Sequence, residues 1–377
     1  MQKTLMYKNN LFLFLILFFA KNKAQELTIP YDDSFGFPII KILINGENHK
    51  FLFDTGAYKT VINSEVFTSL PILDSTNVND SNDMEKPVKL TSFSFNFLNR
   101  HYSDMKVLYL DLNPLSKASN CKNIIISGII GRDIMENYIV ELNPSLKNII
   151  FHNASDFNKN QISGFTRIKL QSDNQRPLIT LKIGGQKRYV LFDTGSNGNL
   201  SVSDDKLKNY INTTEHTAYI SQANRFSAHG VNDRRDLNHT IYNAEIHIGK
   251  LNVKKQIVET SGNDHNNMGF SFISQFITYL DLKGKNLYLK QINKSYFGES
   301  ALKNLGFYIR YDHEQNKNLI VNLSTKNDKL KIGDNILSIN GETPPQNNCD
   351  MYSFLKKFFG IPIKIKLERD NKIIEIE

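Results

Sequence analysis

One hexapeptide with an acidic residue occurs twice in this chain of 377 residues, as FLFDTG ending at Gly56 and as VLFDTG ending at Gly195. Each copy follows an apolar, strand-like run, and the aspartates, Asp54 and Asp193, are 193 − 54 = 139 residues apart. Two carboxylates held about 3 Å apart share one proton, because two like charges that close cannot both form readily. The ionised member can take a proton from water while the protonated member donates one to a developing oxyanion. A pair of this kind can drive the attack of water on a carbonyl group, and the doubled motif supplies the two carboxylates that this chemistry needs.

The residues that follow each aspartate have readable roles. Both glycines allow the backbone to turn sharply and present N–H groups to the carboxylates. In the second copy the next residue is Ser196, whose hydroxyl can hydrogen-bond the Asp193 carboxylate and lower its affinity for a proton. In the first copy the next residue is Ala57, which cannot do this for Asp54. We therefore expect the two aspartates to be inequivalent within a pair that titrates as a unit.

Each hexapeptide belongs to a longer repeat. The first copy reads FPIIKILINGENHKFLFDTGAYKTVIN, and the second reads RPLITLKIGGQKRYVLFDTGSNGNLSVS. Both contain an alternating strand, a turn at Asn45–Gly46 or Gly184–Gly185, and a second strand that ends at the aspartate. Asn-Gly and Gly-Gly are typical turn sequences of β-hairpins, so both aspartates are predicted at the end of a hairpin.

The repeat continues downstream. GIIGRDIMENYIVELNPSLKNIIF contains Gly131, with 131 − 54 = 77, and NNMGFSFISQFITYLDLKGKNLYL contains Gly269, with 269 − 193 = 76. A similar spacing over a whole unit indicates tandem homologous domains. The segments between, Leu73–Leu112 and His216–Glu259, alternate apolar and polar residues and are interpreted as further hairpins. Residues 1–290 are thus predicted to be all-β with one short helix per unit, and the polar stretch Asn153–Ser163 suits a linker.

These motifs resemble the aspartic protease family. FDTGA and IIGRD are similar to the retropepsin-like type, and DTGSNGNLSVS is more like the pepsin-like type, with the similarity covering Phe35–Lys290. The resemblance implies two lobes related by a pseudo-two-fold axis, with Asp54 and Asp193 as the catalytic pair acting on peptide bonds. It also implies that the threonines bond across the interface between the lobes. The residues that would support the catalytic loops are Thr55, Gly56, Thr194, Gly195 and Ser196.

Two features depart from the pattern of that family. The second copy has Asn267–Gly269 (Asn-Met-Gly) where the first has Ile129–Gly131 (Ile-Ile-Gly), which the resemblance identifies as core behind the catalytic loop. The family covers its cleft with a flap hairpin, and the candidates here are FSAHGVNDRR around Gly230 and NVNDSNDMEKP in the first copy. Neither has the familiar flap sequence, and a plain exposed hairpin is an equal interpretation of either one.

The pattern changes from about residue 296. LKNLGFYIRY is followed by NLIVNLS, LKIGDNILSINGE, a helix-like MYSFLKKFF and PIKIKLERDNKIIEIE, which together resemble a PDZ domain. The short helix usually found before the Gly-Asp of its signature is missing. The resemblance implies that an extended peptide or a C-terminus adds a strand beside Phe307–Ile309, while a spacer with an occluded groove is the alternative. The residues that match the carboxylate-binding loop are Leu305, Gly306 and Phe307.

The N-terminus has the pattern of a secretory signal peptide. Two lysines at Lys3 and Lys8 precede an apolar run over Leu11–Ala20, and a small residue, Ala24, marks the expected cleavage site. The run is too short to span a bilayer comfortably, although an anchor that stays attached is the alternative. Removal of four lysines lowers the net charge from +8 to 8 − 4 = +4, and the remaining basic residues are scattered. We expect a secreted or periplasmic protein with no stable membrane span after cleavage and no nucleic-acid partner.

The cysteine and histidine content argues against disulfide frameworks and metals. The chain has 2 cysteines, Cys121 and Cys349, for which two free thiols are expected and a single long-range bridge is the alternative. No Cys-x-x-Cys, His-Glu-x-x-His or His pair at ligand spacing occurs. No metal site and no cofactor are therefore expected.

These patterns together predict a mainly β chain in four parts: a signal peptide (1–24), a first aspartic protease lobe (25–155), a second lobe (156–292) and an α+β PDZ domain (296–377). We expect a monomeric aspartic endopeptidase that takes peptide or protein substrates, with a possible C-terminal peptide ligand at the PDZ domain. One alternative is a non-catalytic peptide-binding protein, against which the two intact aspartates argue. Another is an enzyme that pairs equivalent lobes from two chains.

Overall fold

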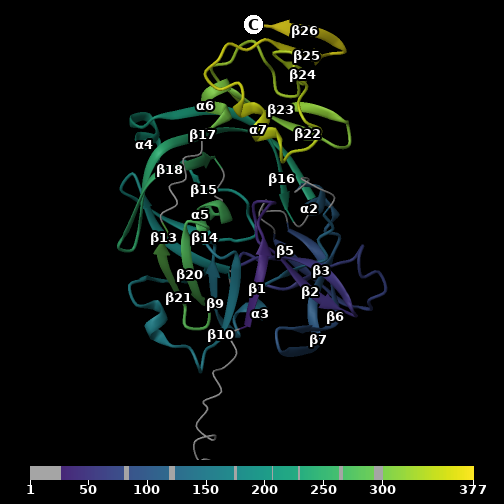
Figure 1. The fold of residues 1–377 in the computed structure, drawn as a ribbon, viewed down its shortest axis with the longest axis vertical. Coiled ribbons are helices and arrows are strands. Elements are labelled where there is room, and N and C mark those ends of the chain that lie inside the picture. Colours follow the sequence, from purple (N-terminus) through teal and green to yellow (C-terminus); the bar gives the residue numbers. More distant parts are fainter. Residues whose placement is uncertain are drawn as a thin grey trace, which may run out of the picture.

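The computed structural model describes residues 27–79, 85–118, 124–173, 176–205, 207–227, 230–262, 266–292 and 300–377. The chain is mainly β, as its sequence predicts: most described elements are strands of two large mixed sheets, and the helices are short (Figure 1). The signal peptide predicted over residues 1–24 lies outside the described part of the chain. Within that part, no helix has the length and apolar character needed to cross a membrane.

The first half of the chain, residues 27–155, is built to deliver Asp54. β2 and β3 form the predicted hairpin, and β3 ends at Phe53, directly before the aspartate. β8 lies parallel to β3 and is followed by the short helix α3. The elements of this half are β1 (Leu27–Asp32), β2 (Ile39–Ile44), β3 (Glu47–Phe53), β4 (Val61–Asn63), β5 (Ile72–Asn79), β6 (Glu85–Phe97), β7 (Arg100–Leu110), α2 (Asn113–Ala118), β8 (Gly128–Ile130), α3 (Arg132–Met135), β9 (Tyr138–Asn143) and β10 (Asn148–Asn153).

The second half, residues 156–292, repeats this order around Asp193. β13 and β14 form a hairpin that ends at Phe192, and β19 lies parallel to β14 and leads into the short helix α5. The elements of this half are η1 (Lys159–Ile162), β11 (Thr166–Lys169), β12 (Gln171–Asp173), β13 (Arg176–Ile183), β14 (Gln186–Phe192), β15 (Leu200–Ser203), α4 (Lys208–Thr213), β16 (His216–Ser227), β17 (Gly230–Ile248), β18 (Leu251–Ser261), β19 (Asn267–Met268), α5 (Phe270–Ile273), β20 (Phe276–Asp281) and β21 (Asn286–Gln291).

The two halves are joined by a sheet to which both contribute equivalent strands. Its order is β1-β10-β9-β20-β21-β11, so the hairpin of one half pairs with the hairpin of the other through β9 and β20. At this seam Val140 lies opposite Leu280 and Leu142 lies opposite Thr278. One continuous cluster of buried apolar side chains runs from Tyr31 to Leu289. The halves therefore share a core, and their positions relative to each other are set by main-chain pairing and by packing.

Each half also carries a hairpin at the position of the expected flap. In the first half β5 and β6 pair from Ile72 to Glu85, and the middle of the candidate NVNDSNDMEKP, residues 80–84, lies outside the described part of the chain. In the second half β16 and β17 pair as far as Ser227 and Gly230, so the other candidate lies at the end of a longer hairpin. Residues 228–229 themselves are not described.

Residues 300–377, called the C-terminal segment below, have a separate core of buried apolar side chains between Ala301 and Leu367. β23 of this segment pairs with β16, which continues the sheet of the second half (Figure 1, yellow segment above β16 and β17). The elements of the segment are α6 (Ala301–Leu305), β22 (Phe307–Asp312), β23 (Lys317–Ser324), β24 (Asn335–Ile339), α7 (Met351–Lys356), β25 (Ile365–Arg369) and β26 (Lys372–Ile376).

The expectation of two free thiols is wrong. Cys349 is disulfide-bonded, and the described residues contain no free cysteine. The chain has one other cysteine, Cys121, which lies outside the described residues. Separation in the sequence is a poor guide here, because β16 contacts both α2, which ends at Ala118, and β23 of the C-terminal segment. The fold thus places α2, which precedes Cys121, and β23, which belongs to the same segment as Cys349, against one strand.

Candidate active site

The two aspartates are held at the ends of buried strands. The residues before them, Phe51–Phe53 and Val190–Phe192, are almost fully buried, which fixes where each strand ends. The Asp54 N–H donates to the Ile130 carbonyl (3.1 Å), and the Asp193 N–H donates to the Met268 carbonyl (3.0 Å). Each catalytic-loop candidate is therefore anchored by the parallel strand behind it, β8 or β19.

The threonines of the two motifs bond across the junction of the halves. The Thr55 N–H donates to Thr194 Oγ1 and the Thr194 N–H donates to Thr55 Oγ1, each over 3.0 Å. Each hydroxyl in turn donates to a carbonyl of the opposite half, Thr55 to Phe192 (2.6 Å) and Thr194 to Phe53 (2.7 Å). Both side chains are buried, so four hydrogen bonds between buried groups join the two halves here.

The glycines allow the two carboxyl groups to approach. A Cβ atom at Gly56 would lie 2.8 Å from Asp193 Cγ, and one at Gly195 would overlap the Asp54 carboxyl group. Their N–H groups also reach the carboxylates: Gly56 donates to Asp54 Oδ1 (2.7 Å) and Gly195 to Asp193 Oδ1 (2.9 Å). The requirement for glycine here comes from this close approach, because neither residue has a positive φ.

The carboxyl groups of Asp54 and Asp193 are hydrogen-bonded to each other. Burial and then the neighbouring charge of Asp193 raise the pKa of Asp54 well above its usual range, and hydrogen bonds from Gly56 and Ala57 oppose this only in part. Asp193 is buried and Asp54 is half-buried. A pair that holds one proton between two carboxyls can present an acid and a base at the same time.

The environment of the second carboxyl differs from the sequence prediction. Among the described residues outside the pair, the side-chain donor to Asp193 is Asn267, whose Nδ2 donates to Oδ2 over 2.9 Å, and Ser196 makes no hydrogen bond to Asp193. Asn267 was noted as a departure from the repeat, but its contact could not be read from the sequence. It depends on the pairing of β19 with β14, which places Asn267 beside Leu191, two residues before the aspartate.

A second residue that the sequence did not single out supports the first loop. Asp133 of α3 accepts hydrogen bonds from the Thr60 N–H (3.0 Å) and from Thr60 Oγ1 (2.6 Å). Burial raises the pKa of Asp133, although its hydrogen bonds with Thr60 oppose the shift. The Arg132 N–H donates to the Ala57 carbonyl (2.9 Å), so α3 holds both ends of the segment that follows Asp54. The signal was the acidic residue of IIGRD, which has Ser271 at the corresponding position of the other half.

In the C-terminal segment, the three residues matched to a carboxylate-binding loop lie at the end of α6 and the start of β22. The Gly306 N–H donates to the Leu302 carbonyl (3.1 Å), so it is engaged within the helix end. Phe307 is fully buried, and Leu305 is half-buried against the same core. Further along β22, the Asn348 side chain bonds both the N–H (2.8 Å) and the carbonyl (3.1 Å) of Tyr311. The main-chain N–H and carbonyl of Tyr311 are therefore already engaged within the segment.

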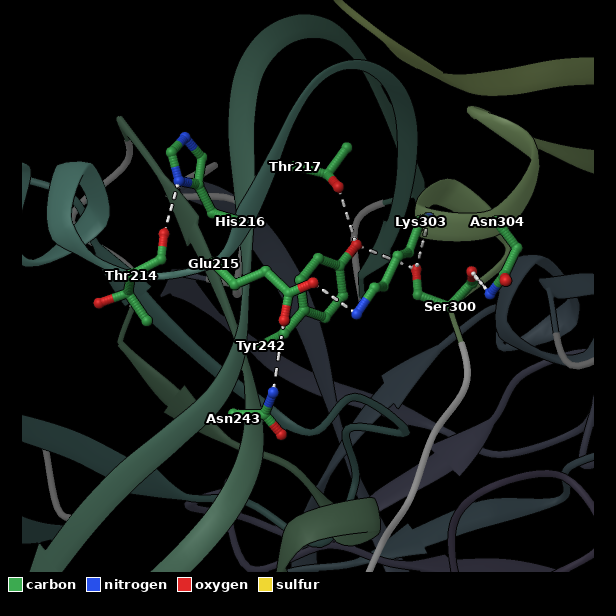
Figure 2. A network of polar contacts seen from close by, with 9 residues as sticks. All are labelled: Thr214, Glu215, His216, Thr217, Tyr242, Asn243, Ser300, Lys303 and Asn304. Atoms are coloured by element: carbon green, nitrogen blue, oxygen red, sulfur yellow. Dashed lines mark hydrogen bonds and ion pairs between the residues drawn. The ribbon is translucent and has the colours of Figure 1, made fainter. Parts of the chain in front are cut away.

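The C-terminal segment is attached to the second half by a polar network beside the paired strands β16 and β23. Figure 2 shows its centre, where the Lys303 ammonium lies 2.6 Å from a Glu215 carboxylate oxygen and 5.0 Å from the centroid of the Tyr242 ring. The Tyr242 hydroxyl donates to Thr217 Oγ1 (3.1 Å) and to Ser300 Oγ (3.4 Å). The start of α6 is thus fixed to β16 and β17 of the second half.

The chain matches none of the models of known protein families and none of the sequences of curated proteins with which it was compared. In the described part of the chain, no group of three or more His, Cys, Asp or Glu side chains is arranged to hold a metal ion. The repeated motif and the geometry around Asp54 and Asp193 are the features of this chain that bear on its function.

Proposed function

We propose that this protein is an aspartic endopeptidase of the retropepsin-like and pepsin-like kind. The observation that carries the proposal is the pair Asp54 and Asp193, whose carboxyl groups are hydrogen-bonded to each other. They lie in two loops with the same Asp-Thr-Gly sequence, and the threonines of these loops are also hydrogen-bonded to each other. Two carboxyl groups cost more free energy to bury when they lie in contact than when they lie apart, so a structural role alone does not explain this pair. A shared proton used for catalysis does explain it.

The reaction follows from the pair. The ionised carboxylate takes a proton from a water molecule as the water oxygen bonds to the carbonyl carbon of the substrate. The protonated carboxyl donates its proton to the carbonyl oxygen, which gives a neutral tetrahedral intermediate. When the C–N bond breaks, the carboxyl that took the proton from water gives it to the leaving amine nitrogen, and the other carboxylate takes a proton from a hydroxyl of the intermediate. The intermediate becomes the carboxylic acid product, and the pair returns to its starting state with one proton. No cofactor is required in this scheme.

The remaining parts of the proposal concern organisation. We assign residues 25–155 and 156–292 to two protease lobes, and residues 296–377 to a PDZ-like domain that binds a substrate or partner C-terminus beside β22. The N-terminal signal peptide directs the chain to a secreted or periplasmic location, where it acts as a monomer without a stable membrane span. The separate core of residues 301–367 supports the third unit.

A peptide library tests the proposal. The mature protein is incubated with peptides derived from a digested proteome, at pH values from 3 to 8, and new termini are identified by mass spectrometry. We expect cleavage by the wild type and none by Asp193→Asn. Products that also appear with Asp193→Asn would contradict the proposed site, and no products with the wild type at any pH would contradict the activity.

A further inference from the structure

We propose that Asn267 is a positioning residue that keeps Asp193 ionised and thereby confines the shared proton to Asp54, so that Asp193 acts as the base and Asp54 as the acid. This inference rests on the proposed function and adds to it the role of each aspartate. The repeat by itself leaves those roles undetermined, because Asp54 and Asp193 have the same motif and each accepts a hydrogen bond from the N–H of its motif glycine. The difference between them lies in side chains that only the fold brings together.

The donors around the two carboxyl groups are distributed differently. Asp193 accepts one hydrogen bond on each oxygen, from the Gly195 N–H on Oδ1 (2.9 Å) and from Asn267 Nδ2 on Oδ2 (2.9 Å). Asp54 accepts both of its loop N–H donors on Oδ1, from Gly56 (2.7 Å) and Ala57 (3.1 Å). A carboxyl that carries a proton does best when one oxygen is not already accepting from a fixed donor, and donors on both oxygens favour the anion. The proton therefore belongs on Asp54 Oδ2.

The corresponding position of the first half carries no such donor. Ile129 lies opposite Leu52 in the parallel pair of β3 and β8, just as Asn267 lies opposite Leu191 in the pair of β14 and β19. Ile129 is buried and has only an apolar side chain. One half therefore supplies a side-chain amide to its aspartate, and the other supplies a hydrocarbon. The two halves therefore have the same backbone pairing at this position but different side chains next to the aspartate.

The amide is also oriented by its surroundings. Asn267 Oδ1 is buried without a hydrogen-bond partner among the described residues. The hydrogen bond that the side-chain amide makes is the one from its Nδ2 to Asp193. If the amide turned over, its oxygen would face the Asp193 carboxylate, and two acceptors would meet unless Asp193 carried the proton. The ionised state of Asp193 and the observed orientation of Asn267 consequently support each other.

Two elements lie beside Asp193: the loop 54–60, whose Gly56 approaches the carboxyl group, and β19, which pairs with β14. The ionisable side chains that these two elements contain are those of Asp54, Tyr58 and Lys59. Tyr58 and Lys59 interact electrostatically with Asp133. Burial and the charge of Asp193 raise the pKa of Asp54, in agreement with a proton held there.

The experiment compares Asn267→Ile, which installs the residue of the first half, with the reciprocal Ile129→Asn and with the double variant. The pH dependence of kcat is measured on one cleaved peptide, together with KM. In Asn267→Ile we expect the acidic limb to move up by about one pH unit, because a donor to the anion is lost, with kcat reduced and KM little changed. In the double variant the donor is moved to Asp54, and the acidic limb should return towards its wild-type position.

An unchanged acidic limb in Asn267→Ile, with only a lower melting temperature, would overturn the positioning role and leave Asn267 a packing residue. Asn267→Ala replaces the isoleucine variant if that variant does not fold, and the same shift is expected. A second readout does not need activity: the carboxyl ¹³C resonances of Asp54 and Asp193 are titrated by NMR in the wild type and the variant. In the wild type Asp54 should keep the resonance of a protonated carboxyl above the pH at which free carboxyls ionise, and the difference between the two resonances should shrink in Asn267→Ile. Absent peptide cleavage would refute the proposed function, whereas equal titration of both carboxyls in the wild type would refute the role of Asn267.

Discussion

The two catalytic-loop candidates share a backbone but are supported by different side chains. The loop after Asp54 is held by Asp133, which accepts hydrogen bonds from the Thr60 N–H and hydroxyl. At the corresponding positions the second half has Ser271, which donates to the Asn197 carbonyl (2.8 Å), and Asn199, which donates to the Ile257 carbonyl (2.9 Å). The first loop is thus held by a half-buried carboxylate, and the second by neutral hydrogen bonds to main-chain carbonyls. Both halves share the Asp-Thr-Gly loop and the hydrogen bonds made by its threonine and glycine, and they differ in the side chains that support this loop.

The hairpins at the expected flap positions of the two halves also differ in what supports them. β16 of the second half has β17 on one side and β23 of the C-terminal segment on the other, with Ser221 Oγ donating to Asn322 Oδ1 (2.7 Å) beside the paired strands. β5 of the first half pairs with β6 alone among the described strands and ends its sheet. A strand with two neighbours is harder to displace than an edge strand. We infer that the hairpin of the first half is the more mobile of the two.

The largest expected effect is on kcat and concerns the aspartates that both halves contribute to the pair. Asp54→Asn and Asp193→Asn should each lower kcat by roughly 10³-fold or more, because either change removes the acid or the base of the pair. Peptide cleavage is measured with each variant, and circular dichroism checks that the fold is kept. Asp111→Asn, an exposed aspartate, serves as the control and should behave as the wild type. Near-full activity in either pair variant would rule out a single shared site.

The next prediction tests the symmetric junction. Thr55→Val and Thr194→Val should each lower the free energy of unfolding by about 2 kcal/mol, because each removes a buried hydroxyl that donates once and accepts once across the halves. The double variant should cost less than the sum of the two, since the hydroxyls share these bonds. Urea unfolding of the three proteins gives the coupling. A large effect from one threonine and none from the other would show that the junction is not symmetric.

How much of this site can be predicted depends on how local each contact is. The motif around each aspartate is a continuous stretch, so its hairpin and its doubled chemistry are visible in the sequence. The donor from Asn267 is 267 − 193 = 74 residues from Asp193 and arises only when β19 pairs with β14. Ser196 is a neighbour in sequence, yet its side chain does not reach Asp193, because proximity along the chain does not fix the direction of a side chain. The disulfide-bonded state of Cys349 was also missed, because a disulfide depends on which parts of the chain the fold brings together and not on their separation in sequence.

A third prediction uses the pH dependence of stability to compare the two aspartates. The pKa of Asp54 is raised by burial and then by Asp193. For a group whose pKa is higher in the folded state, the stabilisation is fully present below the unfolded pKa and is lost as pH rises through the folded value. Asp54→Asn removes this term, so the variant should gain stability relative to the wild type as the pH is raised from 4 to 7. Melting temperatures of both proteins over this range are the measurement.

The control for that comparison is Asp111→Asn, whose melting temperature should follow the wild type at every pH. A melting-temperature difference between Asp54→Asn and the wild type that stays constant from pH 4 to pH 7 would mean that the pKa of Asp54 is not raised on folding. The proton would then have to be placed on Asp193, which would also reverse the assignment of acid and base.

The smallest effect is expected where the C-terminal segment meets the second half. The side chains of Lys303 and Glu215 are about half exposed, so their ion pair is screened by water and contributes little, and the contact of Lys303 with the Tyr242 ring adds a similar amount. Lys303→Met should therefore lower the free energy of unfolding by less than about 1 kcal/mol and leave peptide cleavage unchanged. The main attachment lies in the pairing of β16 with β23, which this substitution does not touch. Lys326→Met, at an exposed residue of the same segment, is the matched control. A changed kcat of Lys303→Met on short peptides would contradict this prediction. It would mean that the side chains at this junction control the hairpin of the second half. The difference in mobility inferred for the two hairpins would then be assigned to the polar network in Figure 2 and not to strand pairing.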